Sequence, residues 1–197
     1  MSLRLLGGQF KGLELQVVES PKLRPTSVML KRRFFDSLQN WQGLGLIDLC
    51  AGSGAIGLEA LSRGASRVLL VEKDPKFYKV LERNTQHCQK RLSSTQQVQS
   101  FLMDVEVFLN KKIHLYLTQQ PLQQWYIYLD PPYDKHQVYF NVLNSFFKLH
   151  LESPAVLWLE SDRQKGISLS TLEASYELGK SFMQGTSFIA EVQRPRE

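Results

Sequence analysis

A short polar segment, Asp130-Pro131-Pro132-Tyr133, follows an apolar run at residues 125–129 and combines an acid, a rigid backbone and an aromatic ring. A buried strand that ends in this way opens onto the crevice where α/β sheets hold their ligands. The Asp130 carboxylate and the Pro131 carbonyl can accept the two N–H groups of an exocyclic amine, while Tyr133 stacks on the attached ring. The segment therefore predicts a site that presents a neutral amino nitrogen to an electrophile.

A glycine-rich segment, IDLCAGSGAIG at residues 47–57, lies between an expected strand and an expected helix. It contains the pattern GxGxxG, and the acidic Glu72 follows at the tip of the next expected strand. Glycines let the backbone approach a ligand closely, and a carboxylate at that tip can accept hydrogen bonds from both hydroxyls of a ribose. The spacing alone fits any cofactor that contains adenosine.

Asp48 distinguishes between such cofactors, because its carboxylate lies where NAD would place a charged pyrophosphate. Two like charges about 5 Å apart at an effective dielectric of about 20 repel by about 3 kcal/mol. S-adenosylmethionine (SAM) instead offers an ammonium to Asp48, a ribose to Glu72 and a carboxylate to the helix that starts at Gly54. In the structural alternative, Asp48 only caps the following turn and Glu72 is a solvated charge. Their joint placement with the glycines and residues 130–133 favours the cofactor site.

The rest of the chain alternates expected strands and helices, which predicts an α/β fold with a mostly parallel sheet covered on both faces. A β-hairpin over residues 3–17 and a helix over 28–38 precede this pattern, and an antiparallel strand pair at 176–180 and 186–192 ends it. The expected strands are 44–49, 67–71, 98–102, 125–129 and 155–160, and the expected helices are 54–63, 75–90, 105–115 and 138–150.

Length and composition indicate one principal domain with a small appendage. The chain has 197 residues, is 43% hydrophobic and 22% charged, and has no apolar run of the roughly 20 residues that a membrane span requires. No secretory or transit segment is recognised at the start, so we expect a cytoplasmic protein. Cys50 and Cys88 fit neither a disulfide framework nor a zinc site, and we expect no metal. The formal charge of +5 slightly favours a polyanionic partner.

The motifs DLCAGSG, VEKD and DPPY, in this order and spacing, resemble the class I SAM-dependent methyltransferases that modify exocyclic amines. LLGGQFKG at residues 5–12, LRPT at 23–26 and AGSGAIGLEALSR at 51–63 narrow the resemblance to the bacterial small-subunit ribosomal RNA guanine-N2 methyltransferases, which methylate guanine 966 of 16S rRNA. The resemblance covers residues 3–192. It implies a Rossmann-like fold with a seven-stranded sheet, an RNA-facing extension (1–40) and a methyltransferase domain (41–197).

The resemblance also implies roles for individual residues. The Asp130 to Tyr133 segment would hold the target guanine, and Asp104 would bind the adenine amino group, although an N-cap role for the helix that starts near residue 105 is an equal alternative. Phe10 is available to stack on a base. The cofactor-binding set is Asp48, Gly52, Ser53, Gly54, Glu72, Lys73 and Asp104, and the RNA-binding set is Arg4, Phe10, Lys11, Arg24, Thr26, Lys31, Arg32 and Arg33.

The chain departs from the family pattern after LRPT, where Val28, Met29 and Arg32 replace an acid, an arginine and a glutamate. We expect direct displacement, in which guanine N2 attacks the sulfonium methyl, in a monomer that acts on ribosomal RNA or on an assembling small subunit. Three alternatives remain open: a methyltransferase for DNA adenine N6 or another planar amine, a catalytically silent RNA-binding or assembly protein, and a nicotinamide oxidoreductase. Asp48 and the DPPY segment disfavour the last.

Overall fold

A seven-stranded sheet forms the centre of the protein. The structure is a computed structural model and describes residues 3–18, 27–38, 40–119, 122–149 and 155–196. Five neighbouring strands are parallel, and β9 pairs antiparallel with both β7 and β8. The predicted mostly parallel sheet with an antiparallel C-terminal hairpin is confirmed. The spatial order is β5 (Gln97–Leu102), β4 (Arg67–Glu72), β3 (Leu44–Asp48), β6 (Gln124–Leu129), β7 (Ala155–Asp162), β9 (Ser187–Pro195) and β8 (Tyr176–Gln184).

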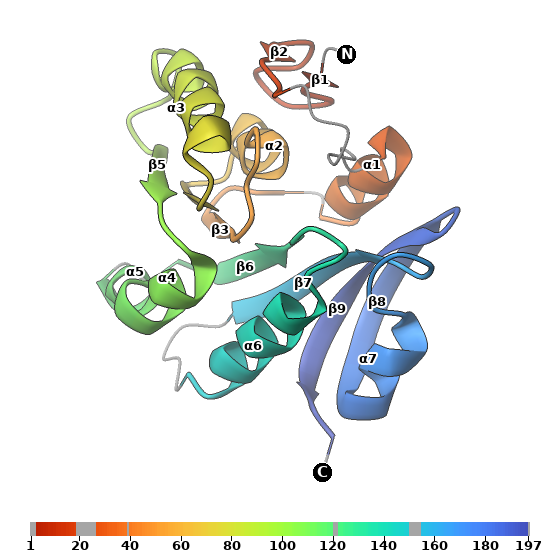
Figure 1. The fold of residues 1–197 in the computed structure, drawn as a ribbon. Helices are drawn as coiled ribbons and strands as arrows, with labels where there is room; N and C mark the ends of the chain where they lie inside the picture. Colours follow the sequence, from red (N-terminus) through yellow and green to blue (C-terminus); the bar gives the residue numbers. More distant parts are fainter. Residues whose placement is uncertain (1–2, 19–26, 39, 120–121, 150–154, 197) are drawn as a thin grey trace.

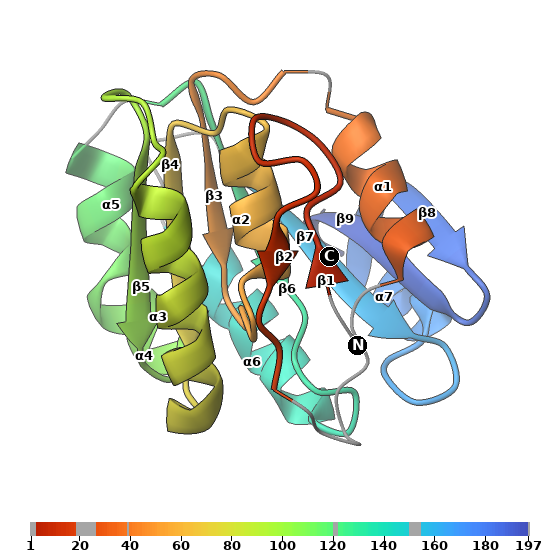
Figure 2. The ribbon, with the colours of Figure 1, turned by 90° about the horizontal axis from the view of Figure 1, so that it is seen from above.

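Helices cover both faces of the sheet (Figures 1 and 2). Side chains alternate along each parallel strand, so that Leu46 and Leu70 pack toward one helical layer while Ile47 and Val71 pack toward the other. The first layer contains α1 (Val28–Asp36), α2 (Ala55–Ser62) and α3 (Pro75–Gln89). The second contains α4 (Val105–Lys111), α5 (Ile113–Gln119), α6 (His136–Phe147) and α7 (Leu169–Ser175).

The N-terminal hairpin lies against α2 and beside α1 (Figure 2). Its strands, β1 (Leu3–Arg4) and β2 (Glu14–Leu15), pair antiparallel, as predicted. The backbone N–H of Phe10 donates to Ser62 Oγ at 2.9 Å, and that of Leu6 donates to Glu59 Oε2 at 2.7 Å. The hairpin, α1, α2 and one face of the sheet share a hydrophobic cluster, so the described parts of the two predicted domains are joined by a common core.

Three details of the expected elements were wrong. The helix expected over residues 105–115 is two helices, because Lys112 leaves the helical conformation with φ −122°, and Phe108 and Ile113 on either side of it are both buried. The short α7 was not predicted; the Ser168 hydroxyl caps it by accepting from the N–H of Thr171. The first strand of the C-terminal hairpin extends to Gln184 rather than ending at residue 180, and the hairpin turns at residues 185–186. No helix in the described part of the chain is long and apolar enough to cross a membrane.

The strand register brings acidic strand ends to one edge of the sheet. Asp48 is the last residue of β3 and pairs in register with Leu70 of β4 and Tyr128 of β6. Glu72 ends β4, and Asp130 directly follows β6. Because the carboxyl ends of parallel strands point the same way, these acids and the loops after them surround a common space.

Candidate functional site at the carboxyl ends of the strands

A cavity of about 790 Å³ lies where the carboxyl ends of β3, β4 and β6 meet the N-terminal hairpin and α1. Most of the predicted cofactor and catalytic residues line it, together with two of the predicted RNA contacts. These lining residues are Asp48, Gly52, Ser53, Glu72, Lys73, Asp130, Pro131, Pro132, Tyr133, Arg4 and Lys31. Two sequence segments about 80 residues apart thus line one space.

The glycine turn after β3 leaves room for a ligand on one side and packs tightly on the other. Gly52 has φ +54°, and nothing lies within 4 Å of the position that a Cβ would occupy there. Gly54 has φ +86° and begins α2; a Cβ on it would lie 2.7 Å from Leu81 Cδ1 of α3. Both backbone conformations disfavour any residue with a side chain. The turn therefore brings bare backbone to the cavity wall while α2 stays packed against α3.

Glu72 holds this turn in place. Its Oε2 accepts from the N–H of Gly52 at 2.9 Å, and its Oε1 accepts from the N–H of Asp74 at 2.9 Å. Each carboxylate oxygen can accept a second hydrogen bond. Glu72 is therefore more than the solvated charge of the structural alternative, and within the described residues its oxygens keep acceptor capacity that ribose hydroxyls could use.

Asp104 acts as a helix cap. Its Oδ1 accepts from the N–H of Glu106 at 2.9 Å, and its Oδ2 lies 3.8 Å from Lys73 Nζ. The neighbours Met103 and Val105 line the cavity. The N-cap alternative for Asp104 is therefore present in the structure, whereas its predicted contact with adenine stays a prediction.

Two carboxyl groups at the strand ends, those of the buried Asp48 and the half-buried Asp130, have raised pKa values. Asp48 is 2% exposed and accepts from the N–H of Gly57 at 3.2 Å. Burial raises its pKa to about 7; the Gly57 hydrogen bond opposes this shift and the charge of Glu72 adds to it. Burial also raises the pKa of Asp130 well above its ordinary value, with further contributions from the charges of Glu160 and Asp48. Ionised carboxylates in this cavity are poorly solvated, so the site favours a cationic ligand.

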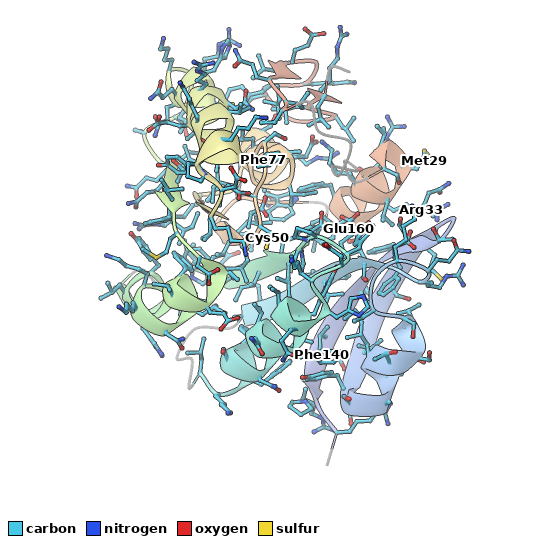
Figure 3. The ribbon with its side chains drawn as sticks, viewed as in Figure 1. Met29, Arg33, Cys50, Phe77, Phe140 and Glu160 are labelled. Atoms are coloured by element: carbon cyan, nitrogen blue, oxygen red, sulfur yellow. The ribbon has the colours of Figure 1, made fainter. Side chains whose placement is uncertain are left out.

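Sequence reasoning missed Glu160 and the two tyrosines that contact it. Glu160 is 1% exposed, and its Oε2 accepts from the Tyr128 hydroxyl at 2.6 Å. The Tyr139 hydroxyl of α6 lies 3.3 Å from the Glu160 carbonyl oxygen and 3.2 Å from that of Pro131. Figure 3 shows Glu160 and Cys50 in the middle of the molecule, between the helical layers. The available signal was an acid at the end of the apolar run 155–159, the same pattern that identified Asp130.

The Tyr139 contact qualifies the expected role of the Pro131 carbonyl. This oxygen already has a donor within reach, so one of its two acceptor positions remains for a substrate N–H. Tyr139 also connects the DPPY segment to β7, because the same hydroxyl reaches the Glu160 carbonyl. The segment is thus held by α6 and β7 as well as by its own prolines.

Two predicted RNA contacts are buried. The burial of Phe10 contradicts its expected role, whereas Lys31 also lines the cavity, so its contact with RNA stays a prediction. Phe10 is 5% exposed and packs in the core beneath the hairpin, so it is not available to stack on a base. Lys31 is 3% exposed, and its Nζ lies 3.4 Å from Glu59 Oε2. The buried side of α1 comprises Leu30, Lys31, Phe34 and Phe35, so the helix turns Lys31 inward.

The other predicted RNA contacts have different surroundings. Arg4 is exposed and pairs with Glu14 at 2.6 Å, and the exposed Arg33 donates to the Met183 carbonyl oxygen at the end of β8. Lys11 and Arg32 are exposed. Val28 and Met29, which replace charged family residues, are 55% and 48% exposed, and Figure 3 shows Met29 on the outer side of α1. Arg24 and Thr26 lie outside the described residues.

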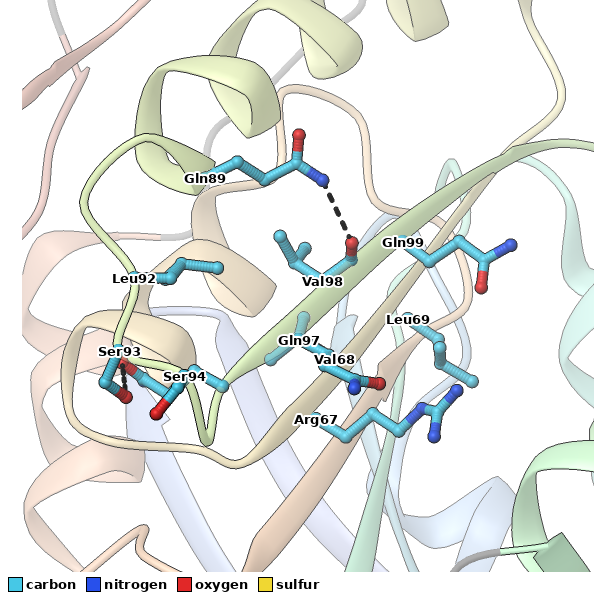
Figure 4. A pocket seen from close by; sticks show the side chains of 11 residues that line it. Arg67, Val68, Leu69, Gln89, Leu92, Ser93, Ser94, Gln97, Val98 and Gln99 are labelled. Carbon is cyan, nitrogen blue, oxygen red and sulfur yellow. Dashed lines mark hydrogen bonds between the residues drawn. The ribbon is translucent and has the colours of Figure 1, made fainter.

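A second hollow, of about 550 Å³, lies at the opposite end of the sheet (Figure 4). The first three residues of β4 and of β5 line it, together with the end of α3 and the loop that follows. Gln89 spans part of it by donating to the Val98 carbonyl oxygen at 3.2 Å. Its lining consists of amide, hydroxyl and aliphatic groups with one arginine, Arg67, and contains no acid. Of these two hollows, only the one at the carboxyl ends of the strands has carboxyl groups in its lining.

The sequence from residue 3 to 189 matches the model of the family described as Conserved hypothetical protein 95. The chain belongs to this family. Ribosomal RNA small subunit methyltransferase D of Escherichia coli K12 is 30% identical over 190 residues, which cover 93% of this chain and 85% of that protein. The protein of the same name from Haemophilus influenzae is 30% identical over 171 residues, covering 83% and 80%. The resemblance to the family of small-subunit ribosomal RNA methyltransferases is thereby confirmed.

Solved structures agree on the fold. The Escherichia coli protein yhhF superposes with a TM-score of 0.74 at 25% identity and covers 98% of both chains. The rRNA methyltransferase aviRa from Streptomyces viridochromogenes has a TM-score of 0.61 at 16% identity, covering 89% of this chain and 88% of that chain. The predicted Rossmann-like fold of a class I methyltransferase is confirmed.

Proposed function

We propose that this protein transfers a methyl group from SAM to the exocyclic N2 of a guanine in small-subunit ribosomal RNA. The observation that carries the proposal is the cavity that both the buried Asp48 and the half-buried Asp130 line. Family membership adds the substrate class, since the relatives from Escherichia coli and Haemophilus influenzae are named as ribosomal RNA small subunit methyltransferases.

The residues of the cavity fit SAM, which supplies an electrophilic methyl group on a sulfonium when it is bound. Asp48 would attract the ammonium of its amino-acid tail, and Glu72 has acceptor capacity for the ribose hydroxyls. The cofactor carries two positive charges, on sulfur and on nitrogen, and buried carboxyl groups with raised pKa values gain most from such charges. The open space at Gly52 lets the cofactor lie against the backbone of the turn.

On the acceptor side, Asp130 would orient the amine and accept its proton. A carboxylate whose pKa is raised is a stronger proton acceptor, and a nearby sulfonium favours its ionised form. Hydrogen bonds from the amine to Asp130 and to the free acceptor position of the Pro131 carbonyl strengthen as positive charge develops on nitrogen. Tyr133, which also lines the cavity, would stack on the base. RNA loops allow a base to leave its stack at low cost.

The test is transfer of radiolabelled methyl from SAM to small-subunit RNA, assembled small subunits and duplex DNA, each offered separately. We expect label at guanine N2, and a decrease of about 100-fold or more in Asp130→Asn, which keeps the side-chain shape but removes the proton acceptor. Asp134→Asn is the matched control, because Asp134 is an exposed acid in the next turn.

Label in DNA adenine would assign the protein to the first alternative. Binding of SAM without transfer to any of the three substrates would identify a silent RNA-binding protein. The exposed Val28 and Met29, which depart from the resembled family pattern, would then be sequence changes that accompany the loss of catalytic activity.

A further inference from the structure

A buried lysine lines the cavity on the side of α1. The Lys31 side chain is 4% exposed, and its Nζ lies 3.4 Å from Glu59 Oε2. Within the described ranges this ammonium has no hydrogen-bond partner. An ammonium carries N–H donors and no acceptor, and leaving such donors unsatisfied in a buried place is unfavourable. Lys31 therefore has donors for acceptor atoms that enter the cavity.

The ion pair with Glu59 leaves the donors of Lys31 available. Glu59 Oε1 lies 2.8 Å from Arg63 Nε, and its Oε2 accepts from the N–H of Leu6 at 2.7 Å. The charge of Glu59 is thus already compensated by Arg63. Burial lowers the pKa of Lys31, and the charge of Glu59 opposes this shift. A polar acceptor beside the ammonium would replace the solvation lost on burial and favour the charged form.

Lys31 lies on the same side of the sheet as Asp130. The Phe34 ring of α1 packs against the Tyr128 ring of β6, with ring centres 5.3 Å apart. Side chains alternate along a strand, so Asp130, two residues after Tyr128, points toward the same helical layer. Because α1 begins at the cavity, where Val28 lines it, Lys31 lies about one helical turn nearer the cavity than Phe34. Lys31 and Asp130 thus approach one space from two facing elements.

The depth of Lys31 distinguishes the parts of an RNA that it can meet. A nucleotide that leaves its stack places its base in the pocket, whereas its phosphates stay with the backbone at the entrance. The exposed Arg4 and Arg32 can contact a backbone there. Lys31 is 3% exposed, so the base is the part of the RNA that enters deeply enough to meet it.

We propose that Lys31 recognises the target guanine by donating to its O6 and N7 atoms, an inference that rests on the proposed function. N2 and O6 project from the two ends of one edge of guanine, so a base that presents N2 to Asp130 carries O6 at the far end of that edge. O6 and N7 are adjacent acceptors, a pair that lysine commonly binds.

The same contact distinguishes guanine from adenine. An adenine that presented its N6 to Asp130 would have a C–H group at the position of O6, so the buried donors of Lys31 would stay unsatisfied. A site built to hydrogen-bond one group of a substrate rejects an analogue that lacks it. Lys31 therefore supplies the selectivity for guanine that the DPPY segment, which can bind any planar amine, lacks.

The test replaces the target guanine with 2,6-diaminopurine, which keeps the 2-amino group and has an amino group in place of O6. The methylated guanine is first mapped, and small-subunit RNA with either base at that position is then prepared by ligation. We expect the wild type to methylate the 2-amino group of guanine with a kcat/KM about 10- to 100-fold higher than that of diaminopurine, as a hydrogen bond from a charged group provides.

Lys31→Met should remove this preference by lowering kcat/KM for guanine, with unchanged SAM binding in calorimetric titrations. Lys31→Arg, which also has donors for O6 and N7, should keep part of the preference. The matched control is Lys111→Met, an exposed lysine in the last turn of α4, which should behave like the wild type.

A wild type without preference between the two bases would overturn the inference without recourse to any variant. So would an equal loss of activity on both RNAs in Lys31→Met, which would indicate a phosphate contact or a structural role, or weaker SAM binding with the preference retained. All three results leave the proposed function intact, because the wild type still methylates guanine N2. Absence of transfer to guanine N2 by the wild type would instead overturn the proposed function together with this inference.

Discussion

The two ends of the parallel sheet differ in the chemistry of their residues. At the carboxyl end, Asp48, Glu72 and Asp130 surround one cavity. At the amino end, β4 and β5 begin with Arg67 and Gln97, and the hollow there has an uncharged lining apart from the arginine. Both hollows are large enough for a ligand. Placing several carboxylates close together in a poorly solvated site is unfavourable. Such a cluster is therefore expected where a ligand of opposite charge compensates for the repulsion.

After Asp130→Asn, the variant Glu160→Gln should produce the largest effect at the carboxyl end of the sheet, a decrease in methyl transfer of about 30-fold. The charge of Glu160 raises the pKa of Asp130, so its removal makes Asp130 a weaker proton acceptor. The acid limb of the pH–rate profile should move to lower pH, because Asp130 then ionises at a lower pH. Glu173→Gln, on the exposed surface of α7, is the control. A lower rate with an unshifted acid limb would show that Glu160 does not act through Asp130.

Asp48→Asn should weaken SAM binding by about tenfold at pH 8. In the wild type, SAM affinity should rise as the pH passes through about 7, because the cofactor binds the ionised carboxylate. In Asp48→Asn, this part of the pH dependence should be absent. Equal pH profiles for SAM binding in the two proteins would exclude Asp48 as the partner of the ammonium.

The same variant should change how the stability of the free protein depends on pH. The pKa of Asp48 is raised from 3.8 to about 7, so the folded state binds its proton more tightly than the unfolded state. The stabilising contribution of this proton is full below pH 3.8 and is lost as the pH rises to about 7. The Tm of the wild type should therefore fall relative to that of Asp48→Asn over this interval. Parallel Tm curves across it would contradict the raised pKa.

Tyr139→Phe should have a smaller effect, a decrease of about three- to fivefold in kcat with little change in the KM for SAM. The substitution removes the hydroxyl that reaches the Pro131 and Glu160 carbonyl oxygens but keeps the buried ring. Tyr126→Phe is a matched control, because Tyr126 lies in β6 on the face that packs against Trp41. A raised KM for SAM with an unchanged kcat would argue that Tyr139 does not position the DPPY segment.

Arg67→Ala should have the smallest effect on activity, within twofold of the wild type, because Arg67 lines the hollow at the amino end. Its guanidinium lies over the Tyr116 ring at 5.2 Å from the ring centre, and a modest decrease in Tm is the only expected change. Steady-state methyl transfer and a thermal melt measure both. A loss of methyl transfer comparable to that of Asp48→Asn would show that residues at both ends of the sheet contribute to activity.

The sequence predicted the sheet and the acids at its carboxyl end because both depend on local patterns. Asp48 and Asp130 each end an apolar run, and the strand register then brings them to one edge. Glu160 has the same pattern, but its importance depends on its contact with Tyr128, which lies 32 residues earlier in the chain. Long-range contacts of this kind leave no signal in the spacing of residues.

The burial of Lys31 in α1 could not be predicted for a similar reason. Leu30 and Phe34 have the spacing of one apolar helix face, so hydrophobicity indicates the side that is buried. The ring of Phe34 packs against Tyr128 and Trp158 of the sheet, each with ring centres 5.3 Å apart. Nothing in the sequence indicates that Lys31 lies on this side, because its place there depends on long-range packing.

The attachment of the hairpin to Glu59 affects how the family can vary in sequence. The donor from the hairpin is the backbone N–H of Leu6, so any residue except proline at position 6 can supply it. Homologous hairpins with different side chains can thus keep the same anchor, and hairpins exchanged between relatives should dock if their chain path is preserved. Conversely, a shortened protein that starts after the hairpin would leave the Glu59 carboxylate with one hydrogen-bond donor fewer and would uncover the apolar side of α2. We therefore expect this fragment to aggregate rather than act as an independent catalyst.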